Sequence, residues 1–226
     1  MRTRIYILVV IFLALHPALV YGQTGEESAS QREYKVKAAF VYNFLKFVVG
    51  GRFGPSDDGD KSKADPNGTI VVAVCGKVPA RESFAELQDK LIKDKHVKVR
   101  FFKGFEDLND SEQKIPDQHP QMDEIRKCHV LFLCPSEKPF LSRILPPLQQ
   151  EGILLVGDTP GFLEAGGTIN LVIEEKKVRF EINLAAAARG KLKIRSSLQR
   201  LAVRMIEHDS LERPDDKGRE GESRNR

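Results

Sequence analysis

The stretch ILLVGDTPGFLEAGGTINL, residues 153–171, indicates the fold of this chain. It begins with a short continuous apolar run, which is typical of a strand buried on both faces, as in a parallel sheet. The tetrapeptide DTPG (158–161) follows directly, and its proline and glycine predict a tight turn or the first turn of a short helix. Gly166 and Gly167 precede the next strand, where they permit a positive φ or a close backbone approach. The stretch therefore predicts a buried strand, a turn and a second strand.

Similar strands alternate with helical patterns along the rest of the chain. TIVVAVCG (69–76) and CHVLFLCPS (128–136) repeat the buried-strand pattern, and VKVRFF (97–102) is a further strand. Apolar residues at helical spacing predict four helices. Their marker residues are Val36, Phe40, Phe44, Phe47 and Val48; Phe84, Leu87 and Leu91; Phe140, Leu141, Ile144, Leu145 and Leu148; and Leu198, Leu201, Ala202 and Met205, the last group capped by Ser196 or Ser197.

The segment TINLVIEEKKVRFEINL (168–184) predicts two strands joined at Glu175 and Lys176, with Phe180 and Ile182 facing the core. Strands that alternate with helices form a mainly parallel sheet covered on both faces. The sequence thus predicts a three-layer α/β/α, Rossmann-like sandwich with a mainly parallel sheet and a C-terminal antiparallel hairpin.

The N-terminus is typical of a secretory signal. Arg2 and Arg4 precede an apolar run that is too short to span a bilayer, and small residues follow at 20–22. We expect residues 1–22 to be a cleaved signal peptide, 23–31 a disordered linker, 32–208 the folded domain and 209–226 a disordered charged tail, because both terminal stretches carry few apolar side chains. Segments 51–68 and 103–123 are rich in turn residues and predict long surface loops.

Composition excludes several classes of partner and cofactor. Without residues 1–22 and their two arginines the net charge falls from +4 to about +2, so nothing predicts nucleic-acid binding or insertion into a membrane after cleavage. DTPG also occurs in nucleotide-switch GTPases, but neither Gly-Lys pair of this chain completes a phosphate-binding GxxxxGK[ST] loop. The histidines show no metal-ligand spacing, and no serine lies in a nucleophile elbow. We therefore expect no enzyme, no cofactor and no metal site.

The segments KAAFVYNFLKFV, VVAVCG, CHVLFLCPSE and LLVGDTPGFLEAGGTINLVIEEKKVRFEINLAAAARGKLKIRSSLQRLA together resemble the YfiR family, over roughly residues 34–205. This resemblance implies a Rossmann-like periplasmic protein that represses a membrane-bound diguanylate cyclase through its periplasmic sensor region, lowering cyclic di-GMP and biofilm formation. It also implies a homodimer. The chain departs from many relatives because it contains no tryptophan after the first helix, and its loop over 54–68 is longer. A different partner, such as a sensor kinase, therefore stays open.

The candidate contact residues lie around the DTPG turn. We interpret Asp158 as the cap of that turn through its carboxylate, with ligand contact as the alternative. Partner or ligand contact is expected from Asp158, Glu164, Arg179 and Glu181. If the protein is instead a small-ligand sensor or carrier, the crevice at the carboxyl ends of the parallel strands, near Gly76, Ser136 and Asp158, is the expected site.

An exported chain can keep a disulfide, and Cys75, Cys128 and Cys134 allow one bridge. Cys75 with Cys134 suits simple strand geometry, since both end a strand. Cys75 and Cys128 stand at positions that resemble a pair bridged in the family, and we favour this pair, although opposite ends of neighbouring parallel strands lie beyond the ~7 Å Cα separation of a disulfide.

Overall fold

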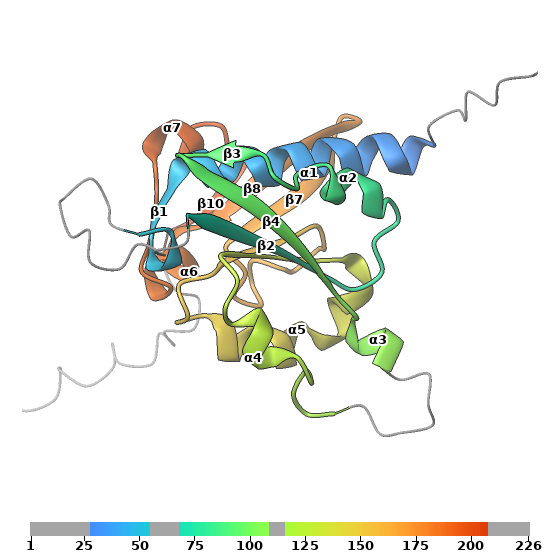
Figure 1. The fold of residues 1–226 in the computed structure, drawn as a ribbon. Helices are drawn as coiled ribbons and strands as arrows, with labels where there is room; N and C mark the ends of the chain where they lie inside the picture. The colour runs from blue at the N-terminus through green and yellow to red at the C-terminus, as the bar shows by residue number, and fades with distance from the viewer. Residues whose placement is uncertain (1–27, 55–67, 109–115, 208–226) are drawn as a thin grey trace, which may run out of the picture.

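The computed structural model describes residues 28–54, 68–108 and 116–207, so the predicted signal peptide, the predicted C-terminal tail and parts of both predicted long loops lie outside the described residues (Figure 1). Its helices are α1 (Ala29–Phe47), α2 (Arg81–Ala85), α3 (Phe105–Leu108), α4 (Met122–Ile125), α5 (Leu141–Ile144), α6 (Leu184–Arg189) and α7 (Ser196–Gln199). The described residues also form the 3-10 turns η1 (Gly51–Phe53), η3 (Pro135–Phe140) and η4 (Pro146–Leu148). The strands are β1 (Val48–Gly50), β2 (Thr69–Cys75), β3 (Leu91–Ile92), β4 (Lys95–Phe102), β5 (Val130–Leu133), β6 (Leu154–Gly157), β7 (Ile169–Glu174), β8 (Lys177–Asn183), β9 (Leu192–Ile194) and β10 (Arg204–Ile206).

One sheet organises the domain, with the strand order β10-β8-β7-β6-β5-β2-β4-β3. The central pairs β4–β2, β2–β5, β5–β6 and β6–β7 are parallel, whereas β7–β8 and β3–β4 are antiparallel hairpins. Strands β5 and β6 are buried along their whole length, as their continuous apolar runs predict. The predicted fold class, with its mainly parallel sheet and C-terminal hairpin, is confirmed.

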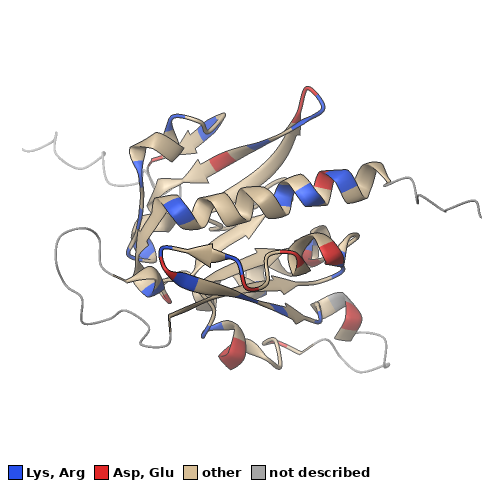
Figure 2. Ribbon diagram, turned by 45° about the horizontal axis from the view of Figure 1, so that its top comes forward, with Lys and Arg blue, Asp and Glu red and all other residues tan. Residues whose placement is uncertain are grey.

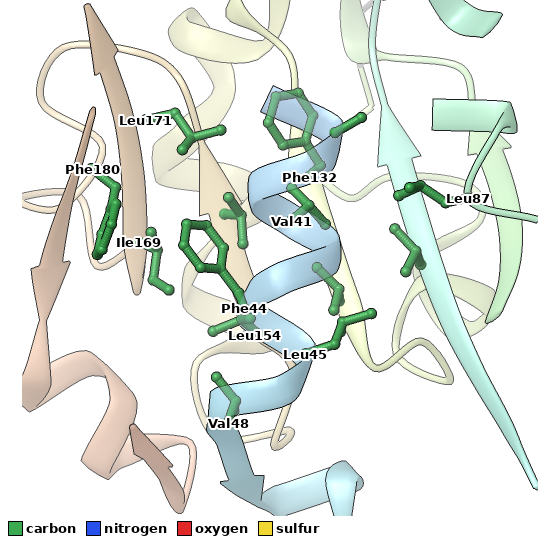
Figure 3. Close-up of a cluster of buried hydrophobic side chains, with 14 of the residues drawn as sticks. Val41, Phe44, Leu45, Val48, Leu87, Phe132, Leu154, Ile169, Leu171 and Phe180 are labelled. Atoms are coloured by element: carbon green, nitrogen blue, oxygen red, sulfur yellow. The ribbon is translucent and has the colours of Figure 1, made fainter. Parts of the chain in front are cut away.

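Helices cover both faces of this sheet (Figure 1). On one face α1 packs with Phe44 and Leu45 against Phe132, Leu154 and Phe180 of three strands, and all five side chains are almost fully buried (Figure 3). On the other face α4 and α5 enclose a second core. Its largest buried side chains are Phe105, Ile125, Leu131, Leu133, Ile144, Leu145, Leu148 and Phe162. Alternate residues of each central strand therefore enter different cores, as the period of a strand requires.

Helix α1 differs from its prediction at two points. It begins at Ala29, inside the predicted linker 23–31, because Ser28 and Gln31 form a reciprocal capping box that satisfies backbone donors of the first turn. Its buried face is Tyr34, Lys37, Ala38, Val41, Phe44 and Leu45, whereas Val36 is 44 % exposed. The buried stripe of α1 is therefore shifted by one residue from the predicted one, with Lys37 and Val41 in place of Val36 and Phe40. The stripe thus includes a lysine.

Several short elements also differ from their predictions. The helix predicted from Phe84, Leu87 and Leu91 is α2, which ends at Ala85, and Leu91 lies in β3. The predicted helix over 140–148 is interrupted by prolines, so it divides into η3, α5 and η4. The last predicted helix is the single turn α7, whose N-cap is Arg195 rather than a serine, and Met205 lies in β10. Helix α6 and the small antiparallel sheet in which β1 pairs with β9 were not predicted from the sequence.

The predicted Cys75–Cys128 bridge is not formed. All three cysteines are free, buried thiols. Cys75 ends β2 beside Leu133 of β5, while Cys128 precedes β5, so the two lie at opposite ends of paired strands, far beyond the ~7 Å limit for a disulfide. Cys134 is the neighbour of Cys75 along the sheet, but the two side chains enter opposite cores.

Candidate functional site

The β7–β8 hairpin projects beyond the strands on either side of it. Strand β6 pairs only with Ile169 and Asn170 of β7, and β10 pairs only with residues 181–183 of β8. Beyond these residues the two hairpin strands pair with each other, and Phe180 O also accepts from Val203 N at 2.9 Å. Figure 2 shows the charged turn of the hairpin standing out beside the N-terminal half of α1. Since the chain must reverse tightly here, Glu175 and Lys176 both adopt a positive φ.

A groove separates this hairpin from the N-terminal half of α1. It consists of an inner pocket of about 570 Å³ and an outer pocket of about 620 Å³, which share Glu33 and Ile173. The inner pocket lies where β6 ends, so it occupies the carboxyl-end position at which ligands bind in open α/β sheets. Its walls are Glu33, Tyr34, Lys37, Pro135, Asp158, Pro160, Gly161, Asn170, Leu171, Val172, Ile173, Glu181 and Arg204.

A buried ion pair forms the floor of the inner pocket. Asp158 Oδ2 accepts hydrogen bonds from Lys37 Nζ at 2.7 Å and from the Tyr34 hydroxyl at 2.9 Å. The side chain of Asp158 is fully buried, that of Lys37 is 6 % exposed, and the ammonium also contacts Glu33 at 2.6 Å. Asp158 Oδ1 accepts no hydrogen bond from the described residues. This pair therefore fastens α1 to the end of β6.

The two charged groups perturb each other's protonation. Burial raises the pKa of the Asp158 carboxyl above its ordinary value, and the Lys37 ammonium and the Tyr34 hydroxyl oppose that rise. Burial alone lowers the pKa of the Lys37 ammonium, but the carboxylates of Asp158 and Glu33 outweigh it and leave that pKa above its ordinary value. Burial and the neighbouring Asp158 together raise the pKa of the Tyr34 hydroxyl far above its usual range, so it stays a donor.

The predicted capping role of Asp158 is wrong. The turn is present, but its backbone is fixed by other groups: Thr159 N donates to Asn170 Oδ1 at 3.1 Å, and Phe162 N donates to Thr159 O at 3.1 Å. The carboxylate of Asp158 is instead directed to α1, because Lys37 and Tyr34 offer it stronger, charged and hydroxyl donors.

The glycines around the turn act as the sequence indicated. Gly166 has a φ of +102°, and a Cβ on Gly157 or Gly167 would overlap the ring of Phe162. That ring is fully buried. The close approach of backbone to Phe162 therefore explains why glycine stands at 157 and 167.

A second polar network borders the pocket on the far side of β7. Asn170 Nδ2 donates to Glu181 at 3.3 Å, and Arg204 donates to Glu181 at 2.7 Å and to Glu164 at 2.8 Å. Of the predicted contact residues, Glu164 and Glu181 are thus joined through Arg204. Glu181 and the buried Asp158 line the inner pocket, whereas Glu164 lines neither pocket. Arg179 is exposed on β8 and lines neither pocket.

The predicted ligand crevice is only partly open. The space beside Gly76 is taken by Ser136 and by the fully buried Glu137, whose carboxylate accepts from Phe105 N and from the Ser136 hydroxyl. Burial raises the pKa of Glu137, and those two hydrogen bonds oppose the rise. Open space near the carboxyl ends is therefore found beside Asp158, not beside Gly76.

Sequence reasoning missed Tyr34, Lys37, Asn170 and Arg204. Lys37 did carry a signal: it stands on the apolar stripe of α1, four residues before Val41, where a charge needs a buried partner. The other three are ordinary polar positions until the strand order brings them together. In the described part of the chain, no group of His, Cys, Asp or Glu side chains is placed to hold a metal ion. None of the described helices is long and apolar enough to cross a bilayer.

The fold and the groove define an α/β/α domain with a recessed, mixed-polarity surface at one end of its sheet. The chain belongs to the YfiR/HmsC-like family, whose model matches residues 34–203. No curated protein sequence matches the chain. Among solved structures, it is similar to a conserved domain protein from Vibrio cholerae, with 10 % identity and a TM-score of 0.49 over 76 % of this chain and 60 % of that one. It is also similar to an ABC domain in complex with L-Trp from Streptococcus pneumoniae, with 11 % identity and a TM-score of 0.40 over 61 % of this chain and 55 % of that one. The chain thus spans less than two thirds of either structure.

Proposed function

We propose that the protein is a periplasmic regulator that represses a membrane-bound diguanylate cyclase by binding the cyclase's periplasmic region. Membership of the YfiR/HmsC-like family suggests a periplasmic regulator of this kind. The signal-like residues 1–22 agree with export. A sensor kinase with a periplasmic region is the other partner of the same type.

The groove between α1 and the β7–β8 hairpin is the observation that carries this proposal. Val36 and Ile173 are 44 % and 52 % exposed within it, although their size and apolarity favour burial. Apolar side chains in a recess with polar surroundings mark interaction sites on soluble domains. A regulator that works by contact needs such a surface.

The experiment compares cyclic di-GMP in four strains: wild type, a strain without this protein, a strain without the candidate cyclase, and a strain without both. We expect loss of the protein to raise cyclic di-GMP only while the cyclase is present, and expression of the exported chain to restore the low level. If loss of the protein raises cyclic di-GMP equally in a strain that already lacks the cyclase, that cyclase is not the target. Unchanged cyclic di-GMP in every strain contradicts the function.

A small-ligand sensor or carrier is the second candidate, and the inner pocket of about 570 Å³ favours it. This volume lies within the ~300–1,000 Å³ that is usual for small-molecule sites. Native mass spectrometry of the protein isolated from cells tests this candidate. A bound metabolite that is lost when Ile173 is replaced by tryptophan supports a ligand role, and the unliganded mass alone contradicts it.

A further inference from the structure

The outer half of the groove combines an apolar floor with a basic rim. Val36 of α1 faces Ile173 and Val178 of the hairpin, and Arg32, Lys176 and Lys177 stand around them. Glu33 is the acidic residue of this lining, and Lys37 already holds its carboxylate. Among the described residues no ion pair joins Arg32, Lys176 or Lys177 to a carboxylate, although Glu174 stands opposite Lys177 in the hairpin register. The rim therefore keeps an excess of positive charge.

We propose that this outer groove docks a segment of the protein partner in which acidic side chains flank a few apolar ones. The proposal rests on the proposed function, since it names the surface through which the regulator holds its partner. Apolar side chains of the segment would cover Val36 and Ile173, and its carboxylates would meet the basic rim. Opposite charges at the rim of an interface steer association and fix the partner's register more than they add affinity.

Charge argues against a second copy of this chain as the occupant. A two-fold contact places the same surface patch on both subunits. Arg32, Lys176 and Lys177 would then face their own copies, and juxtaposed like charges oppose association.

Chain direction argues against the chain's own C-terminal tail. Strand β8 starts at the hairpin turn and runs away from it, and β10 lies parallel to β8, with Ile206 level with Asn183. The chain therefore leaves β10 heading away from the outer groove, which lies near the turn.

Two synthetic peptides of equal length test the surface. Both carry leucine at helical spacing, one with glutamate and the other with lysine at the remaining positions. Fluorescence anisotropy with the protein isolated from cells should show that the glutamate peptide binds about tenfold more tightly than the lysine peptide, and less tightly as salt is raised. Equal binding of both peptides overturns the proposal.

Charge reversal supplies the sharper test. Arg32→Glu with Lys177→Glu should invert the preference, so that the lysine peptide binds better. The matched control is Lys98→Glu with Lys193→Glu, which changes two exposed lysines on strands β4 and β9, outside both pockets, and alters the net charge by the same amount. This control should bind as the wild type does. An equal loss in the control overturns the proposal, because the effect would then be net charge alone.

Two further measurements identify a different occupant. A variant that ends at Glu207 and binds the glutamate peptide about tenfold more tightly would make the tail the occupant and overturn the partner assignment. If the Arg32→Glu, Lys177→Glu variant differs from the wild type in oligomeric mass, a second copy of the chain occupies the groove. That result would also overturn the partner assignment.

The cellular assay separates this proposal from the function on which it rests. If wild-type protein lowers cyclic di-GMP and the charge reversal does not, both stand. If wild-type protein represses and the reversal variant represses equally, the proposed function stands and the outer groove is not its docking surface. If the wild type does not lower cyclic di-GMP, but the charge reversal still changes the preferred peptide from glutamate to lysine, the proposed function fails. The recognition of acidic segments by the outer groove then remains.

Discussion

At the scale of single residues, Lys37 and Asp158 show how a buried charge can hold two distant segments together. Each loses its hydration inside the protein, and the short contact between them offsets that loss only while both are present. The Tyr34 hydroxyl completes the coordination of one carboxylate oxygen, so the end of β6 is fastened to two successive turns of α1.

Breaking this ion pair should therefore cost far more than losing a helix cap. We expect Asp158→Ala to lower the free energy of unfolding by about 3 kcal/mol, because the buried Lys37 ammonium would lose its buried partner and keep only the half-exposed Glu33. Lys37→Met should cost a similar amount, and the double variant much less than the sum, which urea denaturation measures. Glu33→Gln is the control, since its half-exposed contact should contribute less than about 1 kcal/mol. Additive effects of the two single substitutions would contradict the coupling.

The Phe162 ring supplies a second prediction at this scale. Phe162→Ala should cost about 3–4 kcal/mol, since the ring is fully buried. Gly167→Ala should also destabilise, because the new methyl group overlaps that ring, and Phe162→Leu should relieve part of the cost. Thermal unfolding of the three single variants and of the double variant measures this. A Gly167→Ala variant as stable as the wild type would show that the backbone moves freely there.

Glu181 should make stability depend on pH. Hydrogen bonds from Arg204 hold the pKa of its carboxyl below the ordinary value, with burial opposing and Asn170 assisting. A carboxyl whose pKa is lower in the folded state stabilises the fold above its unfolded pKa, and that stabilisation disappears as pH falls through the folded pKa. Melting temperatures between pH 7 and pH 3 should therefore fall less steeply for Glu181→Gln than for the wild type. If the melting temperatures of the two proteins fall in parallel as the pH is lowered, Glu181 does not contribute to the loss of stability in acid.

At the scale of elements, the sequence predicts the strands better than the helices. The continuous apolar segments around Val72, Phe132 and Leu155 predict strands β2, β5 and β6. Such short segments are typical of central parallel strands, because both faces of these strands are buried. The short helices are set by proline positions and by contacts with the sheet, which local patterns do not contain. The groove was still less predictable, since it depends on β6 and β10 ending before the hairpin does.

The hairpin turn allows an element-scale prediction. Glu175 and Lys176 both have a positive φ, which costs side chains other than glycine and asparagine some strain. Glu175→Asn with Lys176→Gly should raise the free energy of unfolding by about 0.5–1 kcal/mol, because Asn-Gly favours this turn type. Chemical denaturation measures the gain, and placing the same two residues in reverse order is the control. A loss of stability would show that the turn is not limited by its backbone.

At the scale of the whole molecule, the groove occupies one end of the sheet, and a separate apolar patch lies elsewhere. Leu201 and Val203, which lie between α7 and β10, are 65 % and 44 % exposed, and Met205 of β10 is 42 % exposed. None of the three lines the groove. Because the groove has a basic rim and this patch carries apolar side chains at a sheet edge, the two surfaces suit different contacts.

We expect the protein to form a homodimer in solution through this second patch. Small regulatory domains commonly associate with two-fold symmetry, and in such a contact an apolar patch packs against the same patch of the second copy. Light scattering at micromolar concentrations should give twice the mass of one chain, and Leu201→Glu with Met205→Glu should reduce it to the mass of a single chain. Ile173→Ser, in the groove, should leave the dimer intact and so controls for a general effect of exposed apolar side chains. A single-chain mass for the wild type would exclude the dimer, and a dimer that survives the double substitution but not Ile173→Ser would place its interface in the groove instead.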